Sequence, residues 1–508
     1  MSNDITLVQL MATGADNSPA LSAPDLEPLD FAGLRSLQLD TVAELNARGI
    51  GRDDRVAIVL PNGPMMAASF ICIACGATTA PLNPAYRQEE FEFYLEDLNA
   101  RALIVERGSE SPAIDAARAK GVEILFIDRH ADDPAGKFHF CDQPGDAKAA
   151  LPGLAQASDV ALILHTSGTT SRPKIVPLSH ANLSQSANNI QQSLGLTQTD
   201  CCMNIMPLFH IHGLVAAILA SLGAGGSTYC TPGFSALAFF SWLDDAAPTW
   251  YTAVPTMHQA ILQRSSRNLD VIKRRPLRFI RSCSSALPTQ VMAAVESCFN
   301  VPVIEAYAMT ESAHQMTSNP LPPKKRKPGT VGIAAGPEVA VMDDAGNILA
   351  AGETGEVVIR GPNVTSGYEN NPKANAENFT HGWFRTGDQG VMDEDGYLTI
   401  TGRLKEIINR AGEKISPREI DDVLMDHPAV EQVVTFAMPH EKLGEEVAAA
   451  VVLRQDMNAD EQELRAFVAS RIAGFKVPKK ILLLDEIPKG ATGKLQRIGL
   501  ARTLGLGG

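Results

Sequence analysis

Short apolar runs alternate with amphipathic stretches through the first three hundred or so residues of this 508-residue chain. The runs at 55–60 and 78–82 have the length and β-branched content of buried strands. The stretches at 40–48, 65–76 and 88–98 have the spacing or length of helices. Strand and helix signals that alternate in this way indicate a parallel sheet with helices on its faces.

The same alternation resumes after residue 170 and then gives way to a different pattern. Helices are predicted at 180–194, 212–223 and 289–299, and strands at 202–207, 249–254 and 277–282. From residue 329 to 402 the segments become short and β-like, and Gly, Asp and Asn turns separate them. This part of the chain therefore predicts a compact β subdomain.

A third pattern begins at Gly402. The sequence Ser416-Pro417-Arg418-Glu419 is a strong helix start, with Ser at the N-cap, Pro at the first helical position and Glu at the third. Strands at 430–437, 448–453 and 480–484 and a helix at 459–472 follow. We predict an α/β fold with an N-terminal domain of stacked α/β sheets plus the β subdomain at 1–402, and a small α+β domain at 403–508.

Composition and charge exclude several classes of partner. The net charge of −14 argues against broad binding of nucleic acid or anionic membranes, so an anionic ligand needs a local basic site. No uninterrupted apolar run reaches the roughly 18 residues of a membrane span, and the N-terminus lacks a basic signal-peptide region. Eight scattered cysteines fit a reducing cytoplasm, with Cys72 and Cys75 expected as buried thiols on a packed helix.

The most informative loop follows the apolar run at 160–164. It reads Thr166-Ser167-Gly168-Thr169-Thr170-Ser171-Arg172-Pro173-Lys174. Its hydroxyls, glycine and cations could bind a polyphosphate, although the spacing is not that of a Walker A loop. By itself the loop could also be an exposed Ser/Thr-rich turn.

Four further motifs carry chemistry-bearing side chains, and each has a plainer alternative. They are 207–213 with two imidazoles, 307–311 with Tyr, Thr and Glu, 384–388 with an Asp after a Gly turn, and 488–494 with a Lys on a Gly-rich loop. Taken singly, they could be a satisfied imidazole pair, surface residues, an Asx turn and a solvated lysine.

Together these five segments, in this order, resemble the adenylate-forming superfamily of acyl-CoA synthetases, peptide-synthetase adenylation domains and luciferases. The resemblance runs from about Asp53 to Arg497 and includes a hinge motif at 402–408. It implies that a carboxylic acid reacts with ATP to give acyl-AMP, after which a mobile C-terminal domain moves and coenzyme A takes the acyl group. ATP and Mg²⁺ are the implied cofactors, and coenzyme A is the implied co-substrate.

The resemblance also implies a role for individual residues. Lys494 and His210 are the implied catalytic residues, Glu311 and Thr166 hold the metal, and Lys405 is the hinge. Ala411, Gly412 and Glu413 border the coenzyme A tunnel. The implied ATP- and AMP-binding residues are Thr166, Ser167, Gly168, Thr169, Thr170, Lys174, Ser285, Ala286, Glu305, Ala306, Tyr307, Thr310, Asp388 and Arg403.

The acid pocket is expected to be polar, lined by His210, His212, Ser282, Ser284 and His314. Such donors suit a short acid with a second carboxylate. The segments 169–174, 305–320 and 361–365 resemble the oxalate–CoA ligases of plants and fungi, which implies that Ser284 and His314 contact oxalate, with Ser282 as a rival for the serine.

Three alternatives remain open. The chain could be a ligase for another short-chain or aromatic acid, an adenylating enzyme that loads a carrier protein, or a nucleotide-binding protein without catalysis. Ile175 stands where the family usually has Gly, and because it is β-branched we expect an altered loop but not a lost activity. We expect a monomer or a homodimer.

Overall fold

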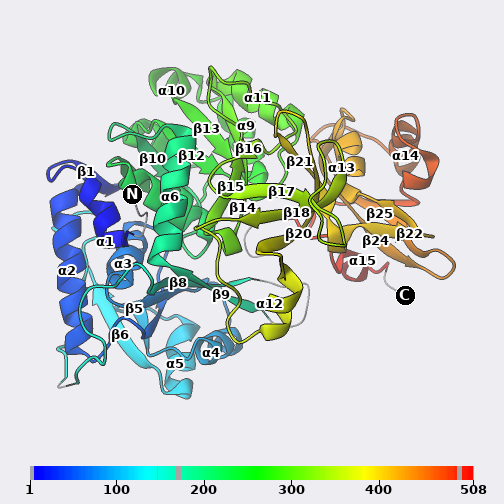
Figure 1. Cartoon of the computed structure of the whole chain (residues 1–508). Coiled ribbons are helices and arrows are strands. Elements are labelled where there is room, and N and C mark those ends of the chain that lie inside the picture. Colours follow the sequence, from blue (N-terminus) through cyan, green and yellow to red (C-terminus); the bar gives the residue numbers. More distant parts are fainter. Residues whose placement is uncertain (1–4, 146, 167–172, 489–494, 507–508) are drawn as a thin grey trace.

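The computed structural model describes residues 5–145, 147–166, 173–488 and 495–506, and two large sheets form its body (Figure 1). The first sheet has nine strands. Their order is β16 (Ile333–Ala334), β15 (His314–Ser318), β14 (Val303–Met309), β13 (Phe279–Ser282), β12 (Trp250–Ala253), β10 (Cys201–Asn204), β11 (Ser227–Cys230), β1 (Pro19–Ala23) and β2 (Leu26–Asp30). The central strands β14, β13, β12, β10 and β11 run parallel, as the alternating pattern predicted.

The second sheet has seven strands and a parallel centre with antiparallel edges. Its order is β7 (His139–Phe140), β6 (Glu123–Asp128), β5 (Ala102–Glu106), β3 (Arg55–Val59), β4 (Thr78–Pro81), β8 (Val160–Thr166) and β9 (Lys174–Ser179). The helices α4 (Gln88–Asp97) and α5 (Pro112–Lys120) connect its strands. The predicted class of stacked α/β sheets is therefore confirmed.

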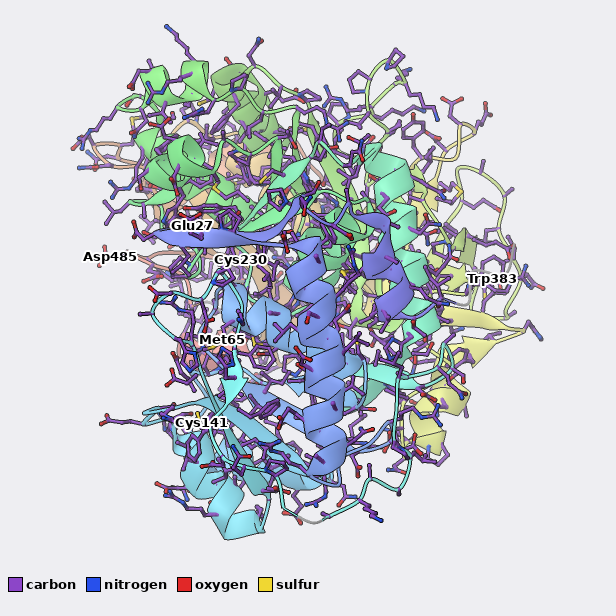
Figure 2. All side chains as sticks on the ribbon, turned by 90° about the vertical axis from the view of Figure 1, so that its left-hand side faces the viewer. Glu27, Met65, Cys141, Cys230, Trp383 and Asp485 are labelled. Carbon is purple, nitrogen blue, oxygen red and sulfur yellow. The ribbon has the colours of Figure 1, made fainter. Side chains whose placement is uncertain are left out.

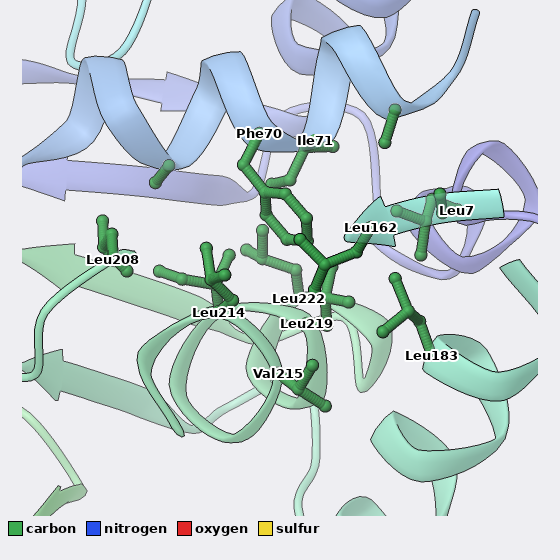
Figure 3. Close-up of a cluster of buried hydrophobic side chains, with 14 of the residues drawn as sticks. Leu7, Phe70, Ile71, Leu162, Leu183, Leu208, Leu214, Val215, Leu219 and Leu222 are labelled. Atoms are coloured by element: carbon green, nitrogen blue, oxygen red, sulfur yellow. The ribbon is translucent and has the colours of Figure 1, made fainter. Parts of the chain in front are cut away.

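The largest buried cluster joins the two sheets. Figure 3 shows Phe70 and Ile71 of α3 (Pro64–Ala74) against Leu162 of β8 and Leu183 of α6 (His180–Leu194). Leu214, Val215 and Leu219 complete it from the segment after β10. The long helix α2 (Phe31–Ala47) covers one side of the molecule and spans the level of both sheets (Figure 2). Burial of this shared apolar surface fixes the sheets relative to each other.

The β subdomain lies between this body and the C-terminal elements (Figure 1). It is a five-stranded sheet in the order β17 (Glu338–Met342), β18 (Thr354–Arg360), β20 (Trp383–Met392) and β19 (Phe379–Thr380), with β21 (Leu398–Arg403) paired to β20. The C-terminal sheet contains β23 (Glu413–Ile415), β22 (Ile408–Arg410), β25 (Gly444–Leu453), β24 (Val430–His440) and β26 (Lys480–Leu483). Helices α13 (Pro417–Met425) and α14 (Glu461–Ala469) accompany it.

Several predicted elements have different bounds. The predicted helix at 212–223 begins as a π-helix, His212–Leu219, and continues as α7 (Ala220–Gly223). The strand predicted at 202–207 ends at Asn204, because the Asn204 side chain bonds both the N–H and the C=O of Met206 and turns the chain. Helix α2 begins nine residues before the predicted start at 40, capped by Asp30.

Cys72 and Cys75 are buried in and directly after α3, as predicted. Among the described residues, no helix is both long and apolar enough to cross a membrane.

Candidate active site

A buried carboxylate joins the nine-stranded sheet to the β subdomain. Gly387 adopts φ +74° in the irregular middle of β20, a conformation that favours glycine, and Asp388 follows it. Asp388 accepts a hydrogen bond from the Tyr307 hydroxyl of β14, and its other oxygen lies 3.0 Å from Arg403 Nε of β21. Burial, together with this carboxylate, raises the pKa of Tyr307 well above its usual range, so the phenol stays a donor.

A second carboxylate lies one turn beyond β14. Glu311 is in the short 3₁₀ helix Thr310–Ser312, and its Oε1 accepts a hydrogen bond from the Tyr368 hydroxyl at 2.8 Å. Lys174 Nζ lies 4.3 Å from the centre of the Tyr368 ring. Burial raises the pKa of Glu311, and the Tyr368 bond and the charges of Arg403 and Lys174 oppose that shift.

The phosphate-loop prediction falls partly on described residues. Thr166 ends β8 and is paired with Lys174, the first residue of β9, so the two ends of the loop are adjacent. Ser167, Gly168, Thr169 and Thr170 lie outside the described residues, as does Lys494. Burial lowers the pKa of Lys174, and the positive charge of the exposed Lys405 lowers it further. Lys174, Lys405 and Arg403 thus form a local group of cations in this acidic chain, close enough to influence Glu311 or one another.

Glu305 is buried at the middle of β14. Its Oε1 accepts a hydrogen bond from Leu287 N at 3.3 Å, which ties it to the turn after β13. Burial raises the pKa of Glu305 to about 7, against the opposing charge of Arg418. Ser285 and Ala286 are exposed in that turn. Next to Glu305 in β14, Ala306 is buried, and Thr310 directly after β14 is half-buried.

Three of the predicted acid-binding residues, His212, Ser284 and His314, form a compact cluster at the carboxyl end of β13. His212 Nδ1 lies 3.0 Å from Ser284 Oγ, and His212 Nε2 lies 2.6 Å from Thr252 Oγ1. The His212 and His314 rings stack with 5.1 Å between centroids, and both side chains are buried. Ser284 and His314 have φ values of +73° and +105°, an uncommon backbone for such residues that places both beside His212.

Other predicted residues lie around or apart from this cluster. His210 is half-buried, and its Nδ1 accepts a hydrogen bond from His212 N at 3.3 Å. Ser282 is fully buried inside the sheet, whereas Ser284 is half-buried and joined to His212. Ala411, Gly412 and Glu413 form the exposed tip of the β22–β23 hairpin, held by hydrogen bonds to Leu443 and Asn409.

Sequence reasoning did not single out Tyr368 or Thr252, and it placed Arg281 only at the start of the turn 281–286 expected to line the acid pocket. Tyr368 comes three residues after Gly361–Thr365, a segment that did carry the resemblance, so an aromatic residue there was a usable signal. Thr252 and Arg281 lie inside apolar strands, where only the fold reveals their partners.

Comparisons with known proteins identify the family of this chain. The family "AMP-binding enzyme" matches residues 18–369, and "AMP-binding enzyme C-terminal domain" matches residues 419–494. The oxalate–CoA ligase of Arabidopsis thaliana is 46% identical over 501 residues, which cover 96% of this chain and 97% of that protein. The oxalate–CoA ligase of Saccharomyces cerevisiae is 44% identical over 480 residues, 89% of this chain and 87% of that one.

A solved structure shows the same arrangement over the whole chain. ATP-bound MatB from Rhodopseudomonas palustris superposes with a TM-score of 0.89 at 28% identity and 99% coverage of each chain. The predicted superfamily, the two-domain α/β fold and the enzyme class, an AMP-forming acid–thiol ligase, are thereby confirmed. This chain belongs to the AMP-binding enzyme family.

Proposed function

We propose that this protein is an ATP-dependent ligase that joins oxalate to coenzyme A and releases AMP and pyrophosphate. The observation that carries the choice of acid is the buried donor cluster of His212, Ser284 and His314. Its imidazole and hydroxyl hydrogen-bonding groups suit a small acid with a second carboxylate better than an alkyl chain. The names of the relatives from Arabidopsis and yeast support the same acid.

The nucleotide is assigned to the other side of the cluster. We propose that Tyr307 stacks on adenine, Asp388 and Arg403 bind the ribose, and Glu305 borders the base. Thr310 and the loop from Thr166 to Lys174 take the phosphates. Ser285, Ala286 and Ala306 line the same site.

ATP, Mg²⁺ and coenzyme A are the cofactors and co-substrate of this family of acid–thiol ligases. The chain offers the oxygen ligands that Mg²⁺ prefers, the Glu311 carboxylate and the Thr166 hydroxyl. Glu311 lies among Lys174, Arg403 and the Tyr368 hydroxyl, a setting that suits a carboxylate beside bound phosphates. When bound, the ion neutralises phosphate charge.

The reaction follows from positioning and charge. An oxygen of the acid attacks the α-phosphorus, the bond to pyrophosphate breaks, and acyl-AMP forms. The thiolate of coenzyme A then attacks the acyl carbon, and AMP leaves with the electron pair of the broken bond. We propose that Lys494 stabilises charge in the first step, with His210 beside the acid.

The two steps require different partners, and we propose that the C-terminal domain supplies them in turn. The domains are 1–402 and 403–508, and backbone rotation at Lys405 would exchange Lys494 for the hairpin at Ala411, Gly412 and Glu413. The hairpin would then border the entry of coenzyme A. In the structure this hairpin is exposed, which leaves it accessible for that role.

One observation favours a second acid class. An apolar cavity of about 200 Å³ lies next to the 207–213 segment, lined by Leu60, Met66, Leu82, Phe209, Phe234 and Met257 among others. It could hold the substituent of another short-chain or aromatic acid. Loading of a carrier protein instead of free coenzyme A is the remaining alternative.

An acid panel separates these functions. Purified protein with ATP, Mg²⁺ and free coenzyme A should form AMP with the highest kcat/KM on oxalate, compared with malonate, benzoate and octanoate. A higher value for any of the other three acids would exclude oxalate as the substrate. AMP formation that requires an added carrier protein would favour the loading enzyme.

Location and assembly remain proposals. We place the enzyme in a reducing cytoplasm because its eight cysteines are free thiols. A monomer or a homodimer is the expected state, and sedimentation equilibrium measures it.

A further inference from the structure

Arg281 is a fully buried cation next to the acid-binding cluster. It lies in β13, and its guanidinium reaches neutral oxygens, Thr252 Oγ1 at 3.5 Å and Gln315 Oε1 at 3.3 Å. Within the described part of the chain no carboxylate forms an ion pair with it, and Nε has no hydrogen-bond acceptor. Burial of an arginine without a counter-charge is strongly destabilising. Because Arg281 nevertheless lies beside the acid-binding cluster, we expect it to have a function there.

The hydrogen bonds of the neighbouring groups have a defined direction. Gln315 Nε2 donates to Ser193 Oγ at 2.9 Å and to Ala335 O at 3.1 Å, so its oxygen faces Arg281. Arginine only donates, so Thr252 Oγ1 accepts from it. A hydroxyl that accepts from a cation is polarised to donate its own proton, and the acceptor at 2.6 Å is His212 Nε2.

The direction continues to Ser284. If His212 Nε2 accepts, the proton of the neutral imidazole is on Nδ1, which lies 3.0 Å from Ser284 Oγ. Ser284 Oγ then accepts from His212, and its own proton is available to a ligand. The opposite tautomer would use that proton on His212 and leave Ser284 as an acceptor, which repels a carboxylate.

We propose that Arg281 is a positioning residue that sets the acid specificity: through Thr252 it holds the His212 proton on Nδ1 and turns the Ser284 hydroxyl toward a carboxylate of a small dicarboxylic acid. This rests on the proposed function for the identity of the acid, but not for the direction of the chain. The buried positive charge favours the acid that brings a second negative charge over one that does not.

Selective ¹⁵N-histidine spectroscopy tests the direction without any substrate. The His212 resonance, assigned with a His212→Gln variant, should show the Nδ1–H tautomer in the wild type. In Thr252→Val that preference should be lost, and in Thr252→Ser it should return. An Nε2–H tautomer in the wild type, or one that Thr252→Val leaves unchanged, would overturn the proposal.

Steady-state kinetics test the consequence. In Thr252→Val and Arg281→Met the KM for oxalate should rise about tenfold, the usual effect of losing one hydrogen bond, with little change in kcat or in the KM for ATP. The selectivity for oxalate over acetate should fall by a similar factor. Thr228→Val is the matched control, because Thr228 is a buried threonine of the same sheet whose hydroxyl makes one long bond, 3.4 Å to Ala217 O.

The outcomes distinguish this inference from the proposed function. Because Arg281→Met removes a buried side chain and can fold poorly, the conclusion is drawn from Thr252→Val, whose melting temperature should equal that of the wild type. An equal loss on oxalate, acetate and ATP would show a purely structural role and overturn the inference. If the wild type prefers another dicarboxylic acid, the proposed function is wrong. The inference is then tested with that acid and its monocarboxylic analogue, and the selectivity between them should fall by the same factor in Thr252→Val.

Discussion

The two halves of the candidate site are built from different kinds of side chain. On the nucleotide side, the Asp388 carboxylate of β20 lies between the Arg403 guanidinium of β21 and the Tyr307 hydroxyl of β14. On the acid side, His212 lies between the Ser284 and Thr252 hydroxyls, and the guanidinium of Arg281 contacts Thr252 on the far side. The first arrangement joins the nine-stranded sheet to the β subdomain. The second lies within the nine-stranded sheet, where β12 and β13 end, and in the segment after β10.

This difference has a physical basis. Charged groups that meet across elements can separate and re-form when a domain moves, because water solvates them in the open state. A buried chain of neutral donors has a fixed direction and discriminates by the shape and charge of a small ligand. We therefore expect nucleotide-side variants to affect turnover and ATP, and acid-side variants to affect the KM of the acid.

The largest expected effect is in Lys494→Ala. Removing one positioned charge should lower the adenylation rate by roughly 10²–10³. Thioester formation from supplied acyl-AMP should stay near the wild-type rate, because the second step does not need this lysine. Pyrophosphate exchange and thioester assays measure the two steps separately, and equal loss of both would contradict the domain movement.

A smaller effect is expected in Asp388→Asn. The amide cannot neutralise Arg403 and is a poorer acceptor for Tyr307, so kcat/KM for ATP should fall by about 10–10². The KM for oxalate should change much less. Asp393→Asn is the matched control, since Asp393 is at the end of the same sheet, paired with Lys327. A larger change for oxalate than for ATP would break the division between the two sides.

Ser284→Ala should act on the opposite side. Loss of one donor to a carboxylate should raise the KM for oxalate about tenfold and leave the KM for ATP unchanged. Ser282→Ala provides a comparison, because Ser282 is fully buried and its hydroxyl has no hydrogen-bond partner among the residues that the structure describes. If Ser282→Ala raised the oxalate KM more than Ser284→Ala, the serine would be misassigned.

The smallest expected effect concerns the pH dependence of stability. Burial raises the pKa of Glu305 to about 7 from the ordinary value of 4.5, so between these values the folded state holds a proton that the unfolded state releases. This contribution to stability is present below pH 4.5 and is lost as the pH rises toward 7. Glu305→Gln should lose less stability over that window. By calorimetry, its melting temperature should fall about 2–4 °C less than that of the wild type between pH 5 and pH 8. A parallel decline in both proteins would show that Glu305 is not the titrating group.

The sequence predicted the general architecture because its signals are local. Alternating strand and helix patterns, the Ser416 helix start and the motif order required no tertiary knowledge. Strand ends were less predictable: β10 stops at Asn204 because of a side-chain bond to Met206 that a run of apolar residues does not reveal. The π-helix at His212–Leu219 depends on packing between the sheets and was predicted as an ordinary helix.

The candidate site was also predictable only in part. Motifs indicated His212 and Glu311, which follow predicted strands, and Asp388, which follows a Gly turn. Tyr368 and Arg281 act through neighbours that are distant along the chain, 57 residues for the Tyr368–Glu311 bond and 29 for Arg281–Thr252. Such pairings arise only when the strands are placed side by side.

The central claim is that the acid side selects oxalate, and a competition assay tests it most directly. Equal concentrations of oxalate, malonate, acetate and benzoate are supplied together with ATP, Mg²⁺ and limiting coenzyme A, and the thioesters are separated by mass spectrometry. The account predicts that oxalyl-CoA is the main product. A product mixture dominated by malonyl-, acetyl- or benzoyl-CoA would contradict it.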